Sequence, residues 1–292
     1  LFNENDLKYT TMQRSTLIEF LKDRLPANLI NYNKKVVEVD QSSKILKIKF
    51  EDNSLVECEK LIISDGIFST TKSLVANKVI KPKYFNSIAV RANIKRDIIK
   101  NINTKNISLF LGSNLHSVLY PIDQSNELNF ISILRKNLNH QEQNNYSLFN
   151  EKGFISSVLS ELSNQVDNEI IHNLKDIKCF PIFTSKKIYY PNNKDIFLIG
   201  DAFFAFPPTF AQGASQSIEV AYELYKTLNI DKKKFHTQRS KRTKMINNRS
   251  RRNYFIFHIS NPLIVFIRNV IIKYLVRNTK FINVYLGKIY KY

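Results

Sequence analysis

Glycine is scarce in this sequence, with six glycines among 292 residues. They are Gly66, Gly112, Gly153, Gly200, Gly213 and Gly287. A dinucleotide-binding βαβ unit uses the spacing G-x-G-x-x-G to bring its backbone against a pyrophosphate. None of these glycines has that spacing, so the printed residues contain no phosphate loop of this type.

Cysteine and long apolar runs are also scarce. Cys58 and Cys179 lie far apart and belong to no C-x-x-C or Cys/His cluster, so we expect two core residues and neither a disulfide scaffold nor a zinc site. The apolar run 262–267 is interrupted by Arg268 and Lys273, well short of the ~20 apolar residues of a membrane span. The length allows one large or two modest domains.

Acidic residues are too few to balance the basic ones. The chain has 44 Lys and Arg against 25 Asp and Glu, a net charge of +19. Residues 231–253 hold ten Lys or Arg and one Asp, a local net of +9. This run is typical of a solvated helix face. Together with the apolar segment 263–267 it also suits docking on an anionic bilayer.

The stretch 195–228 is the most informative part of the chain. Its apolar run 196–199 predicts a buried strand that ends at Gly200-Asp201, and Pro207-Pro208 predicts a rigid turn. A helix with apolar residues at helical spacing is expected from Gly213. Asp201 can accept hydrogen bonds from a hydroxyl, and helix-start amides attract negative charge. An ordinary strand-loop-helix with a solvated Asp fits the local pattern equally well.

Two further segments carry polar residues at the ends of predicted elements. A helix is expected over 12–21, capped by Thr10 or Thr11, with Leu17, Phe20 and Leu21 on its buried side. Arg14 near the start of this helix has two interpretations when taken alone: an ordinary surface charge, or a ligand for a phosphate group. The segment 36–58 predicts an antiparallel meander, and the strand 60–64 ends in Asp65-Gly66 before a helix capped by Ser69.

Residues 84–188 predict a mainly antiparallel sheet with one amphipathic helix. Strands are expected at 87–94, 107–111, 117–120 and 130–134, and the helix at 148–166. His116 lies in one of these strands, where a histidine is either a proton carrier or a structural residue.

The segment around Asp201 resembles a known motif. Gly200-Asp201-Ala202, Pro207, Gln212-Gly213-Ala214-Ser215 and Glu219 are similar to the second flavin motif of the aromatic-ring monooxygenases, which include salicylate-hydroxylase-like and ubiquinone-biosynthesis hydroxylases. The resemblance implies that Asp201 binds the ribityl chain of FAD and that Pro207 and Pro208 line the flavin. It also implies that the helix start at Gly213, Ala214 and Ser215 faces the pyrimidine edge.

The other two segments resemble further parts of the same family pattern. Asp65-Gly66 would approach the pyrophosphate and riboflavin, and Arg14 would contact FAD. The chain departs from the pattern in three places: Phe203-Phe204 replaces the frequent Ala-His, Val220 replaces an Asp, and Lys72 replaces an Arg. These departures bear on the chemistry beside the substrate more than on the flavin.

The resemblance implies a mixed α/β (α+β) fold with a Rossmann-like FAD-binding domain. We expect parts of this domain at 1–80 and 189–230, an inserted substrate domain at 81–188 and a basic helical region at 231–292. Because the chain begins at Leu1 without the family's phosphate loop, we expect an N-terminally truncated member.

The implied activity is hydroxylation of a small phenolic substrate with FAD, NAD(P)H and O2. We expect a cytoplasmic location with peripheral contact to an anionic membrane, no nucleic acid partner and no metal. We assign no catalytic residue. The alternative is a non-catalytic basic protein that docks on membrane or nucleic acid through its tail.

Overall fold

The computed structural model of this chain describes residues 11–122, 126–209, 211–228, 232–285 and 287. Helices and strands are mixed along the chain, which confirms the predicted fold class. The chain divides into two compact units. The first unit comprises residues up to 31, 86–181 and 257–265, and the second comprises 32–85, 182–256 and the residues from 266 onward.

The first unit is built on a five-stranded sheet with the order β6-β7-β8-β5-β9. Its strands are β5 (Lys83–Lys95), β6 (Ser108–Gly112), β7 (Leu115–Ile122), β8 (Glu127–Arg135) and β9 (Lys175–Thr184). The pairs β6·β7, β7·β8 and β5·β8 are antiparallel, as predicted. Strand β9 was not predicted from the sequence. Its buried positions alternate only in its second half, which weakens the strand pattern.

Short helices accompany this sheet. They are α1 (Arg14–Lys22), η2 (Arg96–Ile98), α3 (His140–Asn144), η3 (Leu148–Asn150), α4 (Lys152–Ser163) and α5 (Asn168–His172). Helix α4 buries Val158 and Leu162, which confirms the predicted amphipathic helix with a later start. The prediction for α1 was wrong in two respects: none of its residues is buried, and its N-cap is Gln13. Thr11 instead donates a hydrogen bond to the Pro121 carbonyl, and Thr10 lies outside the described residues.

A pair of histidines lies in the core of the first unit. His116 Nδ1 and His258 Nε2 are 2.8 Å apart, and the two rings are 3% and 2% exposed. Burial lowers the pKa of His116 to about 4. Burial is the largest cause that lowers the pKa of His258 to about 3, and the nearby His116 and Arg135 lower this pKa further. Both rings are therefore neutral at pH 7, one donating and the other accepting, and His116 has a structural role rather than that of a proton carrier.

The second unit contains two small sheets. The three-stranded antiparallel sheet comprises β1 (Val36–Asp40), β2 (Leu46–Phe50) and β3 (Leu55–Cys58), as predicted. The other sheet pairs β4 (Leu61–Ile63) with β10 (Ile196–Leu198) in parallel. Its helices are α2 (Thr70–Val75), α6 (Gly200–Phe204), α7 (Gly213–Thr227), almost all of α8 (Lys232–Phe257), most of α9 (Pro262–Leu275) and α10 (Thr279–Tyr285).

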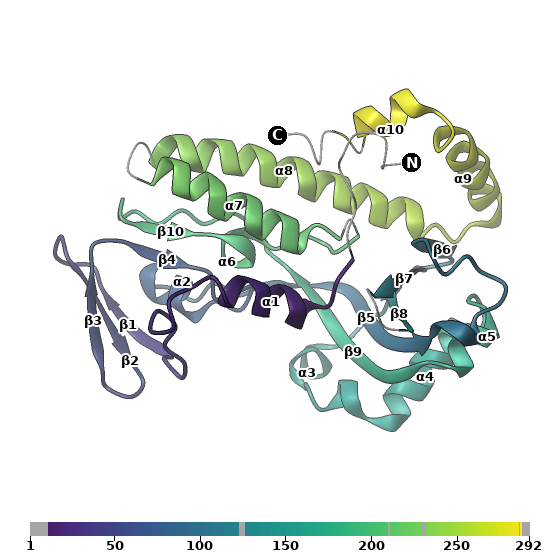
Figure 1. The fold of residues 1–292 in the computed structure, drawn as a ribbon, viewed down its shortest axis with the longest axis horizontal. Coiled ribbons are helices and arrows are strands. Elements are labelled where there is room, and N and C mark those ends of the chain that lie inside the picture. The colour runs from purple at the N-terminus through teal and green to yellow at the C-terminus, as the bar shows by residue number, and fades with distance from the viewer. Residues whose placement is uncertain (1–10, 123–125, 210, 229–231, 286, 288–292) are drawn as a thin grey trace. The chain divides into compact units, whose positions relative to one another are not determined.

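Strand β10 is the centre of this unit because it is buried on both faces. Ile196 and Leu198 belong to one apolar cluster, with side chains from β2, β4, α2 and α6. Phe197 points the other way and packs with Val220 of α7 and Phe235 of α8. A continuous apolar run is the pattern expected of a strand covered on both sides. Figure 1 shows β10 beside α7, with α8 next in order.

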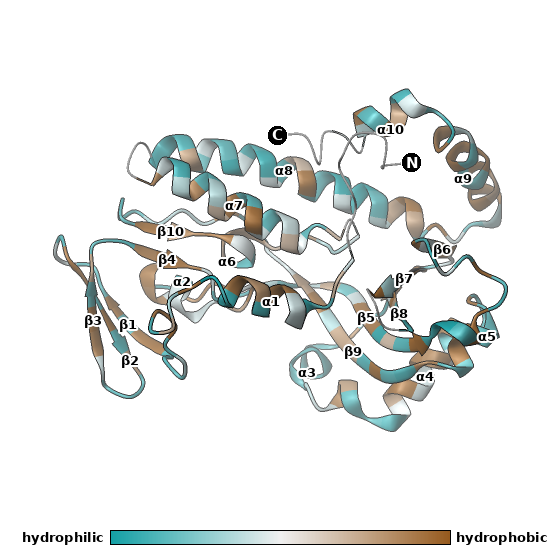
Figure 2. Cartoon of the chain, viewed as in Figure 1, coloured by the Kyte–Doolittle hydropathy of each residue, from teal (hydrophilic) through white to brown (hydrophobic). Residues whose placement is uncertain are grey.

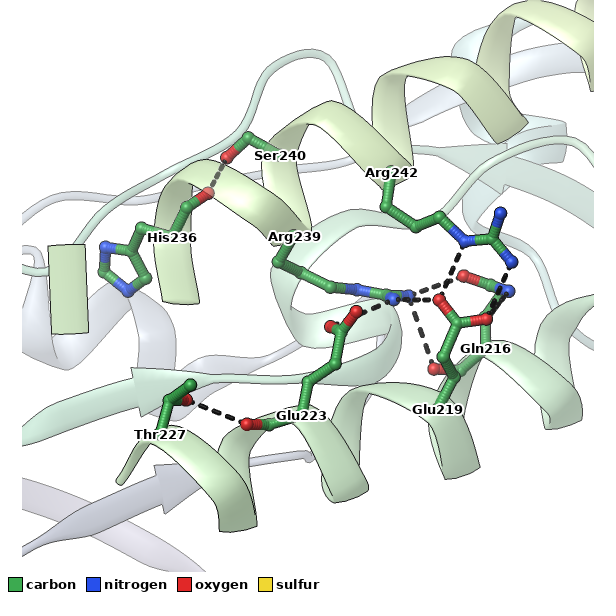
Figure 3. A network of polar contacts seen from close by, with 8 residues as sticks. All are labelled: Gln216, Glu219, Glu223, Thr227, His236, Arg239, Ser240 and Arg242. Atoms are coloured by element: carbon green, nitrogen blue, oxygen red, sulfur yellow. Dashed lines mark hydrogen bonds and ion pairs between the residues drawn. The ribbon is translucent and has the colours of Figure 1, made fainter. Parts of the chain in front are cut away.

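The basic helix α8 is bound to α7 by a network of charges (Figure 3). Arg239 is 4% exposed and contacts the carboxylates of Glu219 and Glu223 at 3.0 and 3.4 Å. Its other nitrogen donates to the Gln216 side chain at 2.8 Å. Arg242 grips both oxygens of Glu219 at 2.8 and 2.9 Å. The run 231–253 is therefore more than a solvated face, since two of its arginines are committed to this interface.

Glu219 is ionised within the network. Burial raises the pKa of this carboxyl, but hydrogen bonds and charge from Arg242 and charge from Arg239 outweigh it and hold the pKa below its usual value. A buried guanidinium is tolerated only where such partners surround it. The network therefore fixes one register of α8 on α7.

Replacing Arg239 with Met should lower the free energy of unfolding by about 3 kcal/mol, because the carboxylates of Glu219 and Glu223 would each lose a cation in a buried interface. Urea denaturation followed by circular dichroism at neutral pH measures this. The matched control is Lys241→Met, an exposed cation on the same helix, which should change stability by less than about 0.5 kcal/mol. Equal losses in both variants would show that the network does not hold α8.

The buried histidines predict a loss of stability in mild acid. The unfolded chain protonates them near pH 6.5, whereas the folded chain does so only near pH 4 and pH 3. The unfolded state therefore holds more protons between these values, so the stabilisation is complete above pH 6.5 and is lost as the pH falls. Each histidine should remove about 1 kcal/mol per pH unit below pH 6.5.

Urea midpoints at pH 7.5 and pH 5 test this expectation. The double variant His116→Leu/His258→Leu should lose less stability between the two pH values than the parent chain. Some loss of stability should remain in the double variant, because His236 has a lowered pKa as well. Burial, and to a smaller extent the charge of Lys232, lowers this pKa to about 4. His140→Gln, at an exposed histidine, should behave like the parent. A double variant with an unchanged pH dependence would exclude the pair as its source.

Candidate functional site

Two predicted site segments follow neighbouring parallel strands. The last residues of β4 and β10, Ile63 and Leu198, are register partners. Asp65-Gly66 begins two residues after β4, and Gly200-Asp201 begins two residues after β10. Parallel neighbours end at the same edge of their sheet, and ligands in α/β folds bind outside this edge. The structure thus brings the two carboxylates to one edge.

The turn after β4 is held by the start of α2. Asp65 accepts a hydrogen bond from the Thr71 amide at 3.3 Å, and Ser69 accepts one from the Lys72 amide at 2.9 Å, which confirms Ser69 as the helix cap. Gly66 has φ +87°, a conformation that favours glycine. A Cβ placed there would meet no atom within 4 Å. The backbone at Gly66 is therefore fixed and faces open space.

Asp201 lies at the start of a short helix that the sequence did not predict. Gly200 has φ +57°, and a Cβ placed there would lie 3.5 Å from the Ser217 hydroxyl of α7. Ala202 and Phe203 are buried in the core, which coils the chain into α6, while Asp201 is exposed. The apolar neighbours thus anchor the turn that presents the carboxylate.

The buried side chain of Lys72 joins the segment that follows β4 to the segment that follows β10. This side chain is 5% exposed, and its Nζ donates to the Ala202 carbonyl at 3.0 Å. Burial lowers the pKa of Lys72, although the charge of Asp65 acts in the opposite direction. From the sequence, Lys72 was expected to be a cation in the place of an Arg. In the structure it instead links α2 to α6 across 130 residues.

The proline segment is fixed between α6 and α7. Pro207 is buried and Pro208 is exposed. Thr209 donates to the Ser250 carbonyl of α8 at 2.7 Å, which ties the segment to the basic helix. Ala211 has φ +50°, a left-handed conformation that costs roughly 1–2 kcal/mol for a residue with a Cβ. The chain therefore enters α7 through a strained and firmly held turn.

The start of α7 is open. Gly213, Ala214 and Ser215 are exposed, and a Cβ at Gly213 would meet no atom within 4 Å. The first turn carries no acidic side chain, and Gln212 makes no side-chain cap in the described part of the chain. Helix-start amides carry partial positive charge, so this end can hold a group with negative charge.

Arg14 is the one predicted site residue that lies outside the second unit. It is exposed on α1, in the first unit, whereas the other nine predicted residues lie in the second. Its part in the site stays a prediction.

The support that α8 gives to the site was not predicted from the sequence. Arg239 donates to Gln216 in the first turn of α7, and Ser250 receives the bond from Thr209. A signal was available, since Glu219 and Glu223 lie four residues apart on one helix and Arg239 and Arg242 lie three apart on the next. Residues at these spacings share a helix face, and opposite charges on two faces suggest a pair.

Known proteins are similar to this chain in sequence. A 6-hydroxynicotinate 3-monooxygenase of Bordetella bronchiseptica is 31% identical over 84 residues, which cover 29% of this chain and 22% of that protein. A 3-amino-4-hydroxybenzoate 2-monooxygenase of Streptomyces platensis is 21% identical over 259 residues, which cover 86% of this chain and 64% of that protein. The chain thus spans less than two thirds of the length of these curated relatives. No family model matches the chain.

The fold is also shared with solved structures. A crystal structure of a Klebsiella pneumoniae HpxO variant in complex with FAD superposes with a TM-score of 0.73 at 16% identity, covering 86% of this chain and 66% of that one. At this identity the likeness concerns the fold. The sequence matches name monooxygenases, two of them FAD-dependent. In sequence and in fold, this chain is similar to FAD-dependent monooxygenases that act on aromatic rings.

Proposed function

We propose that the protein of which this chain is part hydroxylates a small aromatic ring with FAD, NAD(P)H and O2. The observation that carries this proposal is the meeting of two exposed carboxylates at the carboxyl edge of β4 and β10, in the unit that also presents the open start of α7. The alternative of a non-catalytic basic protein has no support among the relatives, whose names are those of monooxygenases.

The residues present fit a flavin dinucleotide. Exposed Asp201 is an acceptor for hydroxyl groups, such as those of a ribityl chain. The open backbone at Gly66 and Gly213 allows a flat or extended group to approach without meeting a side chain. The α7 start offers amides to a group with partial negative charge.

These residues would bind and orient the cofactor. Asp201 would hold the ribityl chain, Asp65-Gly66 would approach the pyrophosphate and riboflavin, and Pro207 and Pro208 would line the ring. The amides of Gly213, Ala214 and Ser215 would stabilise negative charge at the pyrimidine edge. When bound, FAD supplies the redox chemistry, with NAD(P)H as reductant and O2 as oxidant. We assign no side chain the role of catalytic acid or base.

The remaining parts of the proposal concern location and organisation. We propose a cytoplasmic protein in peripheral contact with an anionic membrane. A contribution of Arg14 to FAD binding and domain boundaries at residues 80, 188 and 230 belong to the same proposal. Lys72, which fills the place of the family's Arg, would act on the cofactor only through the loop that it fixes.

Asp201→Ala should weaken FAD binding by roughly tenfold to a hundredfold, because a hydrogen bond to a charged group contributes about 1.5–3 kcal/mol. Quenching of flavin fluorescence during titration measures the dissociation constant in the complete gene product. Substrate-dependent oxidation of NAD(P)H, with the hydroxylated ring identified by mass spectrometry, tests the activity.

The matched control is Asp195→Ala. Asp195 precedes β10 at the amino end of the strand, whereas Asp201 follows it at the carboxyl end. This control should retain the FAD affinity of the parent. Equal affinities in all three proteins would refute the assignment of Asp201, and the absence of any flavin binding by the complete protein would refute the proposed function.

A further inference from the structure

Helix α9 exposes apolar side chains and buries a charged one. Phe266, Ile267, Val270, Ile271 and Tyr274 are between 48% and 70% exposed. We call these five residues the α9 face. Arg268 is the buried residue of this helix, whose residues are all described. A helix that faces water normally shows the opposite arrangement. Figure 2 shows α9 coloured mainly as hydrophobic, in contrast to α8.

The buried Arg268 ties α9 to the end of α8. Arg268 is 6% exposed, and its guanidinium donates to the Ile256 carbonyl at 3.5 Å. It also donates to the Asn269 side chain at 3.0 and 3.1 Å. The Asn269 contact turns with the helix, but turning α9 to hide its apolar residues would break the contact with the Ile256 carbonyl of α8 and would move Arg268 out of its buried position. The outward position of the α9 face is thus part of the fold.

The α9 face forms one continuous stripe. At about 100° per residue, its five side chains fall within about 140° of the helix circumference. The helix has 14 residues and is therefore about 21 Å long. No helix among the described residues is both long enough and apolar enough to cross a membrane. A stripe of this kind suits a helix that lies along a surface with its apolar side inserted.

The charge around the α9 face selects the type of surface. Lys273, Arg277 and Lys280 are exposed on or just after the helix. Residues 232–292 contain 16 Lys or Arg and no Asp or Glu. A second copy of this chain would bring the same cations against these, and like charges repel. An anionic bilayer offers negative charge to the cations and hydrocarbon to the apolar stripe.

We propose that the α9 face docks on an anionic lipid bilayer and inserts its apolar side chains below the headgroups. This inference names the element that makes the peripheral membrane contact proposed above, and it is independent of the flavin chemistry. It also moves the contact away from the run 231–253, where Arg239 and Arg242 are occupied by glutamates. Lys273 and its exposed basic neighbours would contact the headgroups.

Co-sedimentation of the whole chain with lipid vesicles tests the proposal. The chain should bind vesicles of phosphatidylglycerol and phosphatidylcholine at low salt, bind pure phosphatidylcholine much more weakly, and dissociate as salt rises. The triple variant Phe266→Gln/Val270→Gln/Tyr274→Gln should lose more than about tenfold in affinity. All three side chains are more than half exposed, so their replacement should leave the fold intact.

The matched control is Leu55→Gln/Val79→Gln/Tyr225→Gln. These apolar side chains of the second unit are 65%, 76% and 81% exposed and lie outside α9, on β3, in the loop after α2 and on α7. The control should bind vesicles like the parent. Equal binding by both triple variants would refute the α9 face as the docking element. Absence of vesicle binding at low salt, or equal binding to neutral vesicles, would refute the anionic bilayer as its partner.

A fluorescence measurement gives a second, independent readout. The chain contains no tryptophan, so Phe266→Trp introduces a single reporter on the α9 face. Its emission should shift to shorter wavelength when anionic vesicles are added, and Tyr225→Trp on α7 should show no shift. No shift at position 266 would overturn the insertion. Sedimentation velocity that shows a dimer dissociated by the α9 triple variant would assign the face to self-association and overturn the proposal.

The result is separable from that of the flavin experiment. FAD titration of the α9 triple variant should give the affinity of the parent protein. Failure of vesicle binding therefore removes the membrane proposal alone, and failure of FAD binding in the Asp201 experiment removes the proposed function alone.

Discussion

The buried guanidinium of Arg239 is the constraint on which the rest of the second unit depends. A charge in an apolar interior is tolerated only when partners surround it, and here Glu219, Glu223 and Gln216 of α7 do so. These contacts hold α8 against α7. They therefore also fix the position of the first turn of α7. The bond from Thr209 to Ser250 extends the same support to the proline segment. A helix that appears in the sequence as a basic tail is thus the scaffold of the proposed flavin site.

The candidate site shows how a fold presents polar groups at fixed positions. Each segment combines an outward polar residue with inward neighbours: Asp201 is exposed beside buried Ala202 and Phe203. The buried Lys72 of α2 donates to the Ala202 carbonyl of α6, and this bond links the segment that follows β4 to the segment that follows β10. Strained or left-handed backbone at Gly66, Gly200 and Ala211 sharpens the turns between elements. Rigid support of this type is what a cofactor needs in order to be oriented rather than merely bound.

The helices α8 and α9 both lie in the basic C-terminal part of the chain but differ in composition and in what they expose. Helix α8 turns arginines inward because α7 supplies carboxylates for them. Helix α9 does the reverse. It leaves apolar residues exposed, and its only buried side chain is Arg268, which donates to a backbone carbonyl. Net charge alone therefore did not identify the surface that can dock. The arrangement of apolar and charged residues around α9 did so.

The sequence by itself determined the class of fold, most strands, the Ser69 cap and the resemblance to flavin monooxygenases, because these depend on residues within a few positions of each other. The alternation in β5 to β8 and the spacing from Gly200 to Ser215 are local patterns of this kind. Only the tertiary structure decided the partners of Lys72, Arg239 and His116, and the exposure of α1. His116 and His258 are 142 residues apart, and no local pattern reports such a contact. The physical reason is that burial and ion pairing depend on which distant segments meet, whereas propensity and periodicity describe each segment alone.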